Sequence, residues 1–376
     1  NAAAQVTSSA FTYDKTAPTI SQVTSTTNDG SYNVPDEINI TVGFSEAVTL
    51  SGGNLVVTLD TGGTATISSI TAASTASATY TVGSGETSAD LSATGIALSA
   101  GTLTDAAGNA MSVFGGYTDL ADSSALVVDT TVPTISAIGT GALSWGAVLN
   151  ATEDDNNGTV TVTTSGAEDG QTVTITLNGA TYTNTVSSNA TTVTIPAAAL
   201  QALTDGQSYT LTADVSDAAG NAASQVTSSS FAVDTTAPTV SSFTMTDTAL
   251  KSGETSTVTI VFSEAVTGFS SDDDVTAPNG TLAAMTSGDN ITWTGTYTPT
   301  ADVEDATNVL TLATSYTDVA GNAGPSATTL NYIVNTKNDP PTAVNDTATI
   351  AEDSGLSSTN VISNDTDNSG VIADND

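Results

Sequence analysis

Acidic residues recur at fixed places in this sequence, and their chemistry narrows the function most. The motif Asp-x-Ala-Gly-Asn occurs three times, over 105–109, 217–221 and 318–322. Carboxylate and amide oxygens are the ligands that calcium prefers, and the ion takes roughly 6–8 of them. The same five residues also make a tight turn without any ion. Because the motif recurs before the final strand expected in each repeat, we favour calcium sites over turns alone.

The composition excludes most other chemistry. The chain has 40 Asp and Glu against three Lys and Arg, with no His and no Cys, and its net charge is −37. Without His or Cys it lacks the usual catalytic nucleophile–base pairs and the usual zinc ligands. With so few basic residues it cannot neutralise phosphates, so neither nucleic acid nor an anionic membrane is expected as a partner. A glycosidase would need two facing carboxylates in a groove, which the sequence does not specify. We therefore expect no catalysis.

The charge also predicts an environment. A chain this acidic repels itself unless salt screens it or divalent cations neutralise it. No run reaches the ~20 apolar residues of a membrane span. We expect a secreted protein, either extracellular or on a cell surface, without membrane insertion.

The acidic residues lie in a tandem repeat. Related linkers read Asp14-Lys-Thr-Ala-Pro18, Asp129-Thr-Thr-Val-Pro133 and Asp234-Thr-Thr-Ala-Pro238, with a degenerate copy at 335–341. A period of about a hundred residues corresponds to one small domain per repeat. Residues 1–11 closely repeat 221–231, so 1–14 are expected to be the last strand of a preceding repeat. The predicted domains are 15–129, 130–234 and 235–335, followed by the incomplete start of another at 336–376.

Each module has the pattern of a half-buried sheet. In the second, apolar residues alternate with Thr over 159–163, 172–177, 192–195 and 209–215. Turn dipeptides separate these runs at 165–166, 169–170, 178–179 and 205–206, and residues 196–203 read as a short helical turn. About seven short strands per hundred residues indicate an Ig-like sandwich. The predicted fold class is all-β, a tandem array of Ig-like β-sandwich domains forming an elongated rod.

Modules one and three share a further motif. Phe-Ser-Glu-Ala-Val occupies 44–48 and 262–266, after the alternating runs 38–42 and 257–261. In module three, Ile291, Trp293, Gly295 and Tyr297 fall on one face of a strand. We expect Trp293 and Trp145 to fill cores, with sugar stacking as the alternative for Trp293.

Sandwich topology predicts where the acidic residues meet. The loop after the second strand and the loop before the last strand both lie at the pole where the chain enters a module, next to the linker. Carboxylates and asparagines should therefore gather at each joint. The predicted calcium ligands are Asp14, Glu46, Asp105 and Asn109 before module one; Asp129, Glu168, Asp169, Asp217 and Asn221 before module two; and Asp234, Glu264, Asp318 and Asn322 before module three.

Of three other acidic runs, two are less specific and the C-terminal one has a sharper pattern. Residues 153–155 and 272–274 are expected to be solvated loops, with secondary cation sites as the alternative. The tail from Asp365 and Asp367 to Asp376 has the Asp-x-Asp-x-Ser-Gly spacing of a calcium loop, although it ends in Asp rather than Glu. It is either a calcium site or an Asn/Asp-rich turn.

Several of these segments resemble a known class of repeat. Residues 168–179, 217–221 and 234–238 resemble the bacterial Ig-like repeats of giant type I-secreted, RTX-type adhesins. Residues 339–346, 352–353 and 364–367 resemble the cadherin-like repeats of the same proteins. The resemblance implies an extender with calcium at its joints that holds a ligand-binding domain away from the cell.

Two functional hypotheses remain. The favoured one is a calcium-stiffened extender, or stalk, of a bacterial cell-surface adhesin that serves cell adhesion and biofilm formation, with calcium and the neighbouring repeats as partners. The alternative is a subunit of an extracellular filament or surface layer, in which residues 1–14 complete another copy by strand exchange.

Overall fold

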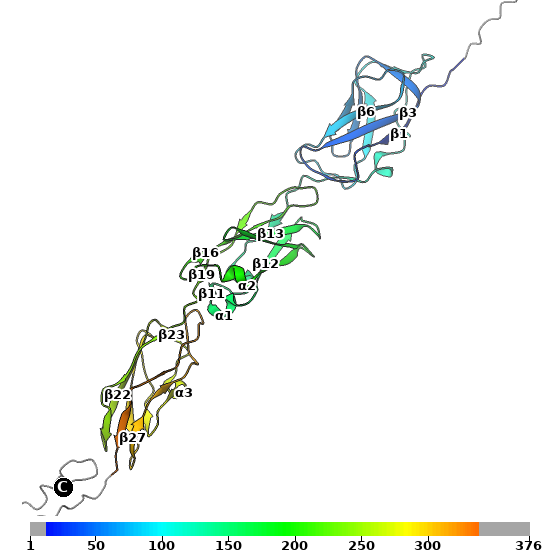
Figure 1. Cartoon of the computed structure of the whole chain (residues 1–376). Coiled ribbons are helices and arrows are strands. Elements are labelled where there is room, and N and C mark those ends of the chain that lie inside the picture. The colour runs from blue at the N-terminus through cyan, green and yellow to red at the C-terminus, as the bar shows by residue number, and fades with distance from the viewer. Residues whose placement is uncertain (1–12, 338–376) are drawn as a thin grey trace, which may run out of the picture. The chain divides into compact units, whose positions relative to one another are not determined.

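The computed structural model describes residues 13–337, which form three β-sandwiches separated by short linkers (Figure 1). The chain divides into two compact units, one of Asn1–Ala147 with Asn156–Ala232 and one of Val148–Asp155 with Val233–Asp376. Strands dominate, and each helix in the described part has only three or four residues. The predicted all-β class is thereby confirmed.

The first sandwich is built around one long strand. Its sheets have the orders β1-β3-β6 and β5-β4-β7, while β2 pairs in parallel with β9 and β8 pairs with β3. Apolar residues of β3 and β4 alternate inward and form the core. The elements are β1 (Ile20–Thr24), β2 (Gly30–Tyr32), β3 (Glu37–Ser51), β4 (Leu55–Leu59), β5 (Thr64–Ile67), β6 (Ala73–Thr81), β7 (Ala93–Leu98), β8 (Thr102–Thr104), the 3-10 helix η1 (Leu120–Asp122) and β9 (Leu126–Val128).

Strand β3 changes partners at the Phe-Ser-Glu-Ala-Val motif. Its pairing with β6 is regular up to Gly43 and then shifts register before Val48. Beyond that irregularity, Thr49 pairs with Thr104 of β8. Phe44 and Val48 are buried, whereas Glu46 between them is half-buried. The motif is therefore the segment that carries the chain from one sheet to another while directing a glutamate toward β8.

The second sandwich follows the predicted strands closely. Its sheets have the orders β10-β12-β15, β14-β13-β17-β18 and β11-β19-β16. The elements are β10 (Thr134–Ile135), η2 (Thr140–Ala142), β11 (Val148–Leu149), α1 (Ala151–Asp154), β12 (Gly158–Ser165), β13 (Thr172–Leu177), β14 (Ala180–Thr185), β15 (Ala190–Ile195), α2 (Ala197–Leu200), β16 (Ser208–Tyr209), β17 (Leu211–Asp214), β18 (Val226–Thr227) and β19 (Phe231–Val233).

The turns in this sandwich lie where the dipeptides predicted them. Gly166, Gly170, Gly179 and Gly206 all have positive φ, the region that favours glycine. Asn178 also has positive φ, as a type I′ hairpin turn requires, and it joins β13 to β14. The expected helical turn after Pro196 is α2.

Two details of the second sandwich differ from the sequence prediction. Strand β14 was not predicted, because almost every side chain on it is exposed and its sequence has no apolar alternation. The single strand predicted over 209–215 is two strands, since β16 pairs with β19 and β17 pairs with β13. One alternating run therefore serves two sheets.

The third sandwich has the sheet orders β20-β22-β26-β25, β21-β31-β27, β23-β29 and β24-β28-β30. Its core is rich in aromatic rings, and Trp293 packs edge-on against Phe269 with ring centroids 4.8 Å apart. The elements are β20 (Val240–Met245), β21 (Ala249–Lys251), β22 (Ser256–Phe262), β23 (Val266–Thr267), α3 (Ser271–Asp274), β24 (Val275–Thr276), β25 (Gly280–Leu282), β26 (Thr292–Pro299), β27 (Glu304–Asn308), β28 (Thr311–Leu312), β29 (Thr317–Asp318), β30 (Ala327–Thr328) and β31 (Tyr332–Asn335).

The two tryptophans contribute to packing, as predicted. Trp145 is buried and lies edge-on to Phe231, with ring centroids 5.3 Å apart. Trp293 is only half-buried but packs against the core of the third sandwich.

The other acidic runs are not simple solvated loops. Residues 151–154 form α1, and Asn150 and Glu153 close a reciprocal capping box at its start. In the run 272–274, Asp274 is buried, accepts a hydrogen bond from Ser270 N at 2.8 Å and accepts another from the Ser315 hydroxyl. The prediction of a solvated loop was wrong for Asp274, whose carboxylate ties α3 to the loop before β29.

Candidate metal sites

Asp14, Glu46 and Asp105 meet at one end of the first sandwich. Asp14 comes from the linker before β1, Glu46 from β3, and Asp105 directly follows β8. One carboxylate oxygen from each residue lies within 4.8 Å of the others. Three segments far apart in the sequence thus supply three acidic oxygens to one small volume. We name this group the first triad.

The turn after β8 holds Asp105 in place. Asn109 N donates to Asp105 Oδ1 at 2.8 Å, and Asn109 Nδ2 donates to Asp105 Oδ2 at 2.7 Å. The same Nδ2 reaches the carbonyl of Asp14 at 3.3 Å, which joins the linker to the turn. Gly108 has φ +90°, a conformation that a residue with a side chain rarely adopts.

The two better-enclosed carboxylates of the first triad have opposite pKa shifts. Loss of hydration raises the pKa of Glu46, and the neighbouring charges of Asp105 and Asp14 raise it further. The hydrogen bond from the Asn109 side chain lowers the pKa of Asp105, although burial opposes this. The neighbouring carboxylates thus oppose the charge of Glu46, whereas hydrogen bonds of the turn support the charge of Asp105.

The second triad lies in the third sandwich and consists of Asp234, Glu264 and Asp318. Their carboxylate oxygens also lie within 4.8 Å of one another. Asp318, at the end of β29, has no solvent exposure. Its Oδ1 accepts hydrogen bonds from Gly321 N at 2.7 Å and Asn322 N at 2.9 Å, and its Oδ2 accepts one from Asn322 Nδ2 at 2.8 Å.

The asparagine of each turn presents its NH₂ group to the carboxylates. Asn322 Nδ2 donates to the Asp234 carbonyl at 2.9 Å as well as to Asp318, and Asn322 Oδ1 accepts from Ala151 N at 2.8 Å. Asn221 Nδ2 likewise donates to the Asp129 carbonyl and to Asp217, both at 2.9 Å. This geometry makes these asparagines ties between linker and loop, because an NH₂ group cannot ligate calcium.

The corresponding group in the second sandwich is arranged differently. Asp217 and Asn221 form the same turn, but Glu168 Oε2 accepts from Ala218 N at 2.8 Å. Asp169 Oδ1 accepts from Ser188 N at 2.7 Å. Within residues 13–337, Asp129, Glu168 and Asp217 do not form a triad of the kind seen in the other two sandwiches.

Strand register accounts for this difference. Thr19, the residue after Pro18, pairs with Ser45, and Thr239 pairs with Ser263 in the same way. In the second sandwich, Thr134 pairs with Ser165. The next residues are Glu46, Glu264 and Gly166, respectively. Gly166 therefore stands where the triads have glutamate, and Glu168 lies two residues further along.

A second group of residues at these sites was not predicted. Asn150, which precedes α1, donates through Nδ2 to the carbonyl of Ala320 in the third Asp-x-Ala-Gly-Asn turn at 3.0 Å. Asn33 directly follows β2, as Asn150 follows β11. Its backbone N donates to the Asp36 carboxylate, just as Asn150 N donates to the Glu153 carboxylate. The spacing Asn-x-x-Asp/Glu, a capping-box pattern, is the signal that could have revealed both turns.

Some predicted features fall elsewhere. The predicted ligands Asp365 and Asp367 lie outside the described residues. So does most of the strand expected within residues 1–14, of which only residues 13 and 14 are described.

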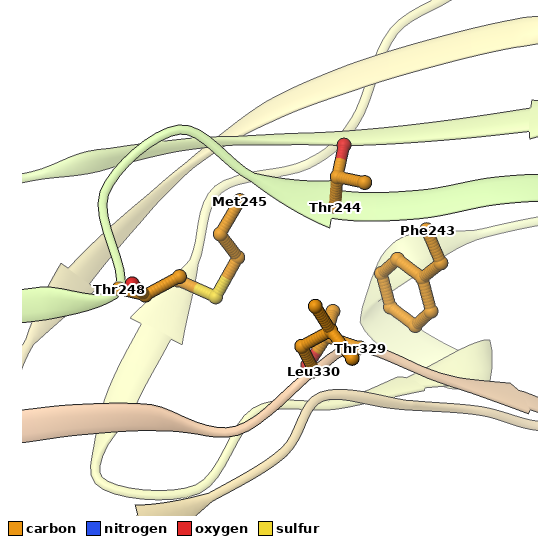
Figure 2. A pocket seen from close by; sticks show the side chains of 6 residues that line it. All are labelled: Phe243, Thr244, Met245, Thr248, Thr329 and Leu330. Carbon is orange, nitrogen blue, oxygen red and sulfur yellow. The ribbon is translucent and has the colours of Figure 1, made fainter.

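A small hollow on the third sandwich has a different character from the triads (Figure 2). It lies between β20 and the segment before β31 and holds about 80 Å³. Phe243, Thr244, Met245, Thr248, Thr329 and Leu330 line it, and none of these residues is titratable. Its volume is well below the roughly 300–1,000 Å³ of typical small-molecule sites.

Among residues 13–337, no helix is long and apolar enough to cross a membrane.

Comparison with known proteins finds a family match for the third sandwich. Residues 234–334 match the family described as bacterial Ig-like domain. No curated protein matches the sequence. Similar solved structures include a Ca²⁺-stabilized adhesin that helps an Antarctic bacterium reach out and bind ice, at 24% identity over 88% of this chain and 77% of that chain, with a TM-score of 0.45.

Two further solved structures are similar. A 1.5-MDa bacterial ice-binding adhesin has 21% identity over 84% of this chain and 97% of its own, with a TM-score of 0.45. A bacterial immunoglobulin-like domain from the M. primoryensis ice-binding adhesin has 33% identity over 27% of this chain and 95% of its own, with a TM-score of 0.21.

Proposed function

We propose that this chain, whose residues 234–334 are a bacterial Ig-like domain, is an extender segment of a bacterial cell-surface adhesin, stiffened by calcium at its joints. Its role is structural and adhesive, without catalysis, and it acts outside the cell. The proposed modules are 15–129, 130–234 and 235–335, with 1–14 ending a preceding repeat and 336–376 beginning a cadherin-like one.

The observation that carries this proposal is the pair of triads. Each brings a linker aspartate, the glutamate of a Phe-Ser-Glu-Ala-Val motif and the first aspartate of an Asp-x-Ala-Gly-Asn turn to within 4.8 Å. Carboxylate oxygens with this spacing suit calcium, which is bound by oxygens at about 2.3–2.6 Å in flexible geometries. In the proposed sites, Asp14, Glu46 and Asp105 hold one ion and Asp234, Glu264 and Asp318 hold another. Backbone carbonyls and waters would complete each shell.

A bound ion would change the mechanics of the linker. Two unit charges 4 Å apart repel by about 1 kcal/mol in water and about 4 kcal/mol near a protein surface. Without a cation, this repulsion pushes the linker aspartate away from the loop and strand carboxylates. A divalent ion replaces repulsion by attraction and ties the linker to the sandwich that follows it. The linker then has fewer conformations, which is the physical basis of stiffening.

The same chemistry favours an extracellular setting. Extracellular calcium modules bind the ion at roughly 10⁻⁴–10⁻³ M, so calcium-rich external fluids fill such sites whereas cytosol does not. A chain of net charge −37 also needs screening or counterions to stay compact. Calcium would supply such counterions at the two triads, where three carboxylate oxygens lie within 4.8 Å of one another.

The descriptions of two similar proteins support this proposal. One is described as a Ca²⁺-stabilized adhesin, and another as an ice-binding adhesin of 1.5 MDa. The proposal assigns the described residues to the extender alone and assigns no adhesion target to them.

Thermal unfolding of the full chain tests the proposal directly. A ligand at concentration c that binds only the folded state stabilises it by RT ln(1 + c/Kd), which is about 1.4 kcal/mol per site at a concentration of ten times Kd. We expect a higher Tm in millimolar calcium than in chelator, and a smaller rise in magnesium, which demands stricter octahedral geometry. Equal melting curves in calcium and chelator would refute the calcium sites.

A further inference from the structure

Residues 148–155 make a contact that requires no metal ion. They connect β10 to β12 along the chain, yet they belong to the same compact unit as the third sandwich. Asn150 Nδ2 donates to Ala320 O at 3.0 Å, and Ala151 N donates to Asn322 Oδ1 at 2.8 Å. Both acceptors lie in the turn that also supplies Asp318. The turn is thus held from one side by its own aspartate and from the other by this segment.

The conformation of the segment is fixed by its own hydrogen bonds. Asn150 Oδ1 accepts from Thr152 N and Glu153 N, both at 3.0 Å, and Glu153 Oε2 accepts from Asn150 N at 3.1 Å. One side of the Asn150 amide therefore caps α1, which leaves its NH₂ group to reach Ala320. A capped, preorganised donor loses little conformational entropy when it binds.

The partner turn is shaped to receive this amide. A Cβ atom on Gly321 would lie 3.0 Å from Asn150 Nδ2, and Gly321 has φ +101°. The glycine is therefore required both for the backbone conformation and for the close approach of Asn150.

Part of this arrangement recurs one repeat earlier. Asn33 N donates to Asp36 Oδ2 at 2.9 Å, and Asn33 Nδ2 lies 3.4 Å from the position of a Cβ on Gly220. Gly220 belongs to the second Asp-x-Ala-Gly-Asn turn and has φ +90°. In the third sandwich, Lys251 has this position, and its N donates to Glu254 Oε2 at 2.8 Å. The lysine side chain has no amide group, so it cannot accept the capping hydrogen bonds and donate to a neighbouring turn at the same time.

We propose that the Asn-x-x-Asp/Glu turn at the far end of one sandwich binds the Asp-x-Ala-Gly-Asn turn of the next sandwich along the chain. This contact, which we call the latch, restrains the relative orientation of the two sandwiches without calcium. Asn150 is its central residue, and Asn33 has the same role one repeat earlier. The latch and the proposed calcium sites share a turn, but they act through different groups. Each should therefore be removable without the other.

A matched substitution isolates the latch. Serine caps helices about as well as asparagine, so N150S keeps the cap of α1. It removes the NH₂ group that reaches Ala320. N33S makes the same change at the other turn and serves as the control. E264Q removes a carboxylate of the second triad and leaves Asn150 intact.

Distances across the segment provide the measurement. The chain has no native cysteine, so T183C and T296C, at exposed positions on β14 and β26, accept spin labels on the full chain. In chelator, we expect a narrow distance distribution for the parent and for N33S, and loss of that narrow peak for N150S. In the same buffer, E264Q should match the parent, and calcium should narrow the N150S distribution again.

Two outcomes would overturn the latch. One is a distribution in chelator as narrow for N150S as for the parent, and the other is a parent distribution already as broad as that of N150S. Failure of the calcium proposal has a separate signature, because calcium would then leave the N150S distribution unchanged. Equal Tm values for N150S and N33S in chelator would show that any broadening does not come from unfolding.

Discussion

Gly166 in the second sandwich occupies the place that Glu46 occupies in the first. Each residue directly follows a serine that pairs with the threonine after the linker proline: Ser45 with Thr19, and Ser165 with Thr134. Glu264 has the same place in the third sandwich. The register thus gives two repeats a glutamate at the linker and gives the middle repeat a glycine. Glu168 reaches the turn by another route and accepts from Ala218 N.

This difference predicts unequal calcium sites. We expect E46Q and E264Q each to abolish one of the stronger sites in a calorimetric calcium titration of the full chain. Loss of one charge from a triad should weaken binding at least about tenfold, which is about 1.4 kcal/mol. E168Q should change the two stronger sites little, because Glu168 belongs to neither triad.

The number of strong calcium sites found in the titration checks this prediction. The doubly substituted chain E46Q/E264Q should retain only weak binding. If E168Q instead removed a site as strong as the others, the middle repeat would hold calcium through Glu168, and the inequality inferred from strand register would be wrong.

Asn322 should matter for stability even without calcium. N322A removes the NH₂ group that serves both Asp318 Oδ2 and the Asp234 carbonyl. Asp318 has no solvent exposure, so water cannot readily replace this donor. Leaving a buried polar group without its partner costs about 1–3 kcal/mol. Denaturant unfolding in chelator, followed by Trp293 fluorescence, measures this cost.

Asn184 offers a comparison for that measurement. It is exposed, and its Nδ2 also donates to a backbone carbonyl, that of Thr192, at 2.9 Å. N184A should change the free energy of unfolding by no more than about 0.5 kcal/mol. Similar small effects for N322A and N184A would show that the turn asparagine is not a structural tie.

The core of the second sandwich depends on Gly158. A Cβ at this position would lie 2.4 Å from Trp145 Cζ3 and 2.7 Å from Cε3. Overpacking of this kind costs about 1–3 kcal/mol, so G158A should destabilise the sandwich by that amount. A Cβ on Gly141 would meet no atom within 4 Å, so G141A provides the matched variant. Unfolding followed by Trp145 fluorescence should separate the two, and equal midpoints would contradict the packing argument.

Alkaline pH should destabilise the first and third sandwiches. Burial, with the hydrogen bond to Glu86 second, raises the pKa of Tyr80 to about 12, and burial with the charge of Asp274 raises the pKa of Tyr316 to about 12. An unfolded tyrosine ionises at a pKa of about 10. Between these values the folded state holds protons that the unfolded state releases, so stability is full below pH 10 or so and falls as pH rises toward 12.

Tyrosinate absorbance measures this directly. Burial also raises the pKa of Tyr32, Tyr117, Tyr297 and Tyr332, so Tyr80 and Tyr316 should belong to a group of tyrosines that ionises later in the folded chain than in denaturant. Y80F should remove one member of this group. A single transition near the ordinary tyrosine pKa in the folded chain would contradict the burial of these phenols.

Much of the fold was predictable because it depends on local patterns. The alternating runs became β12, β13, β15 and β17, and turn glycines such as Gly179 have the positive φ that their dipeptides predicted. Strand β14 was missed since its side chains face solvent and carry no alternation. Burial of Asp274 was missed because its partner Ser315 is brought to it only by tertiary folding, whereas its other partner, Ser270, is local.

The sites were predictable only in part. Sandwich topology indicated which loops approach each linker, and the structure brings Asp14, Glu46 and Asp105 together, as it does Asp234, Glu264 and Asp318. Topology could not indicate that Gly166 takes the glutamate position, because this depends on pairing to a single residue. Nor could it indicate which end of an asparagine amide faces the carboxylates, or that Asn150 reaches Ala320 across 170 residues of sequence.

The central claim is that calcium at the triads stiffens the chain, and small-angle scattering of the full chain tests it most directly. We predict a larger maximum dimension and a narrower set of fitted conformations in millimolar calcium than in chelator, with most of this difference lost in E46Q/E264Q. Identical scattering in calcium and chelator, or an unchanged calcium response in the doubly substituted chain, would contradict the account.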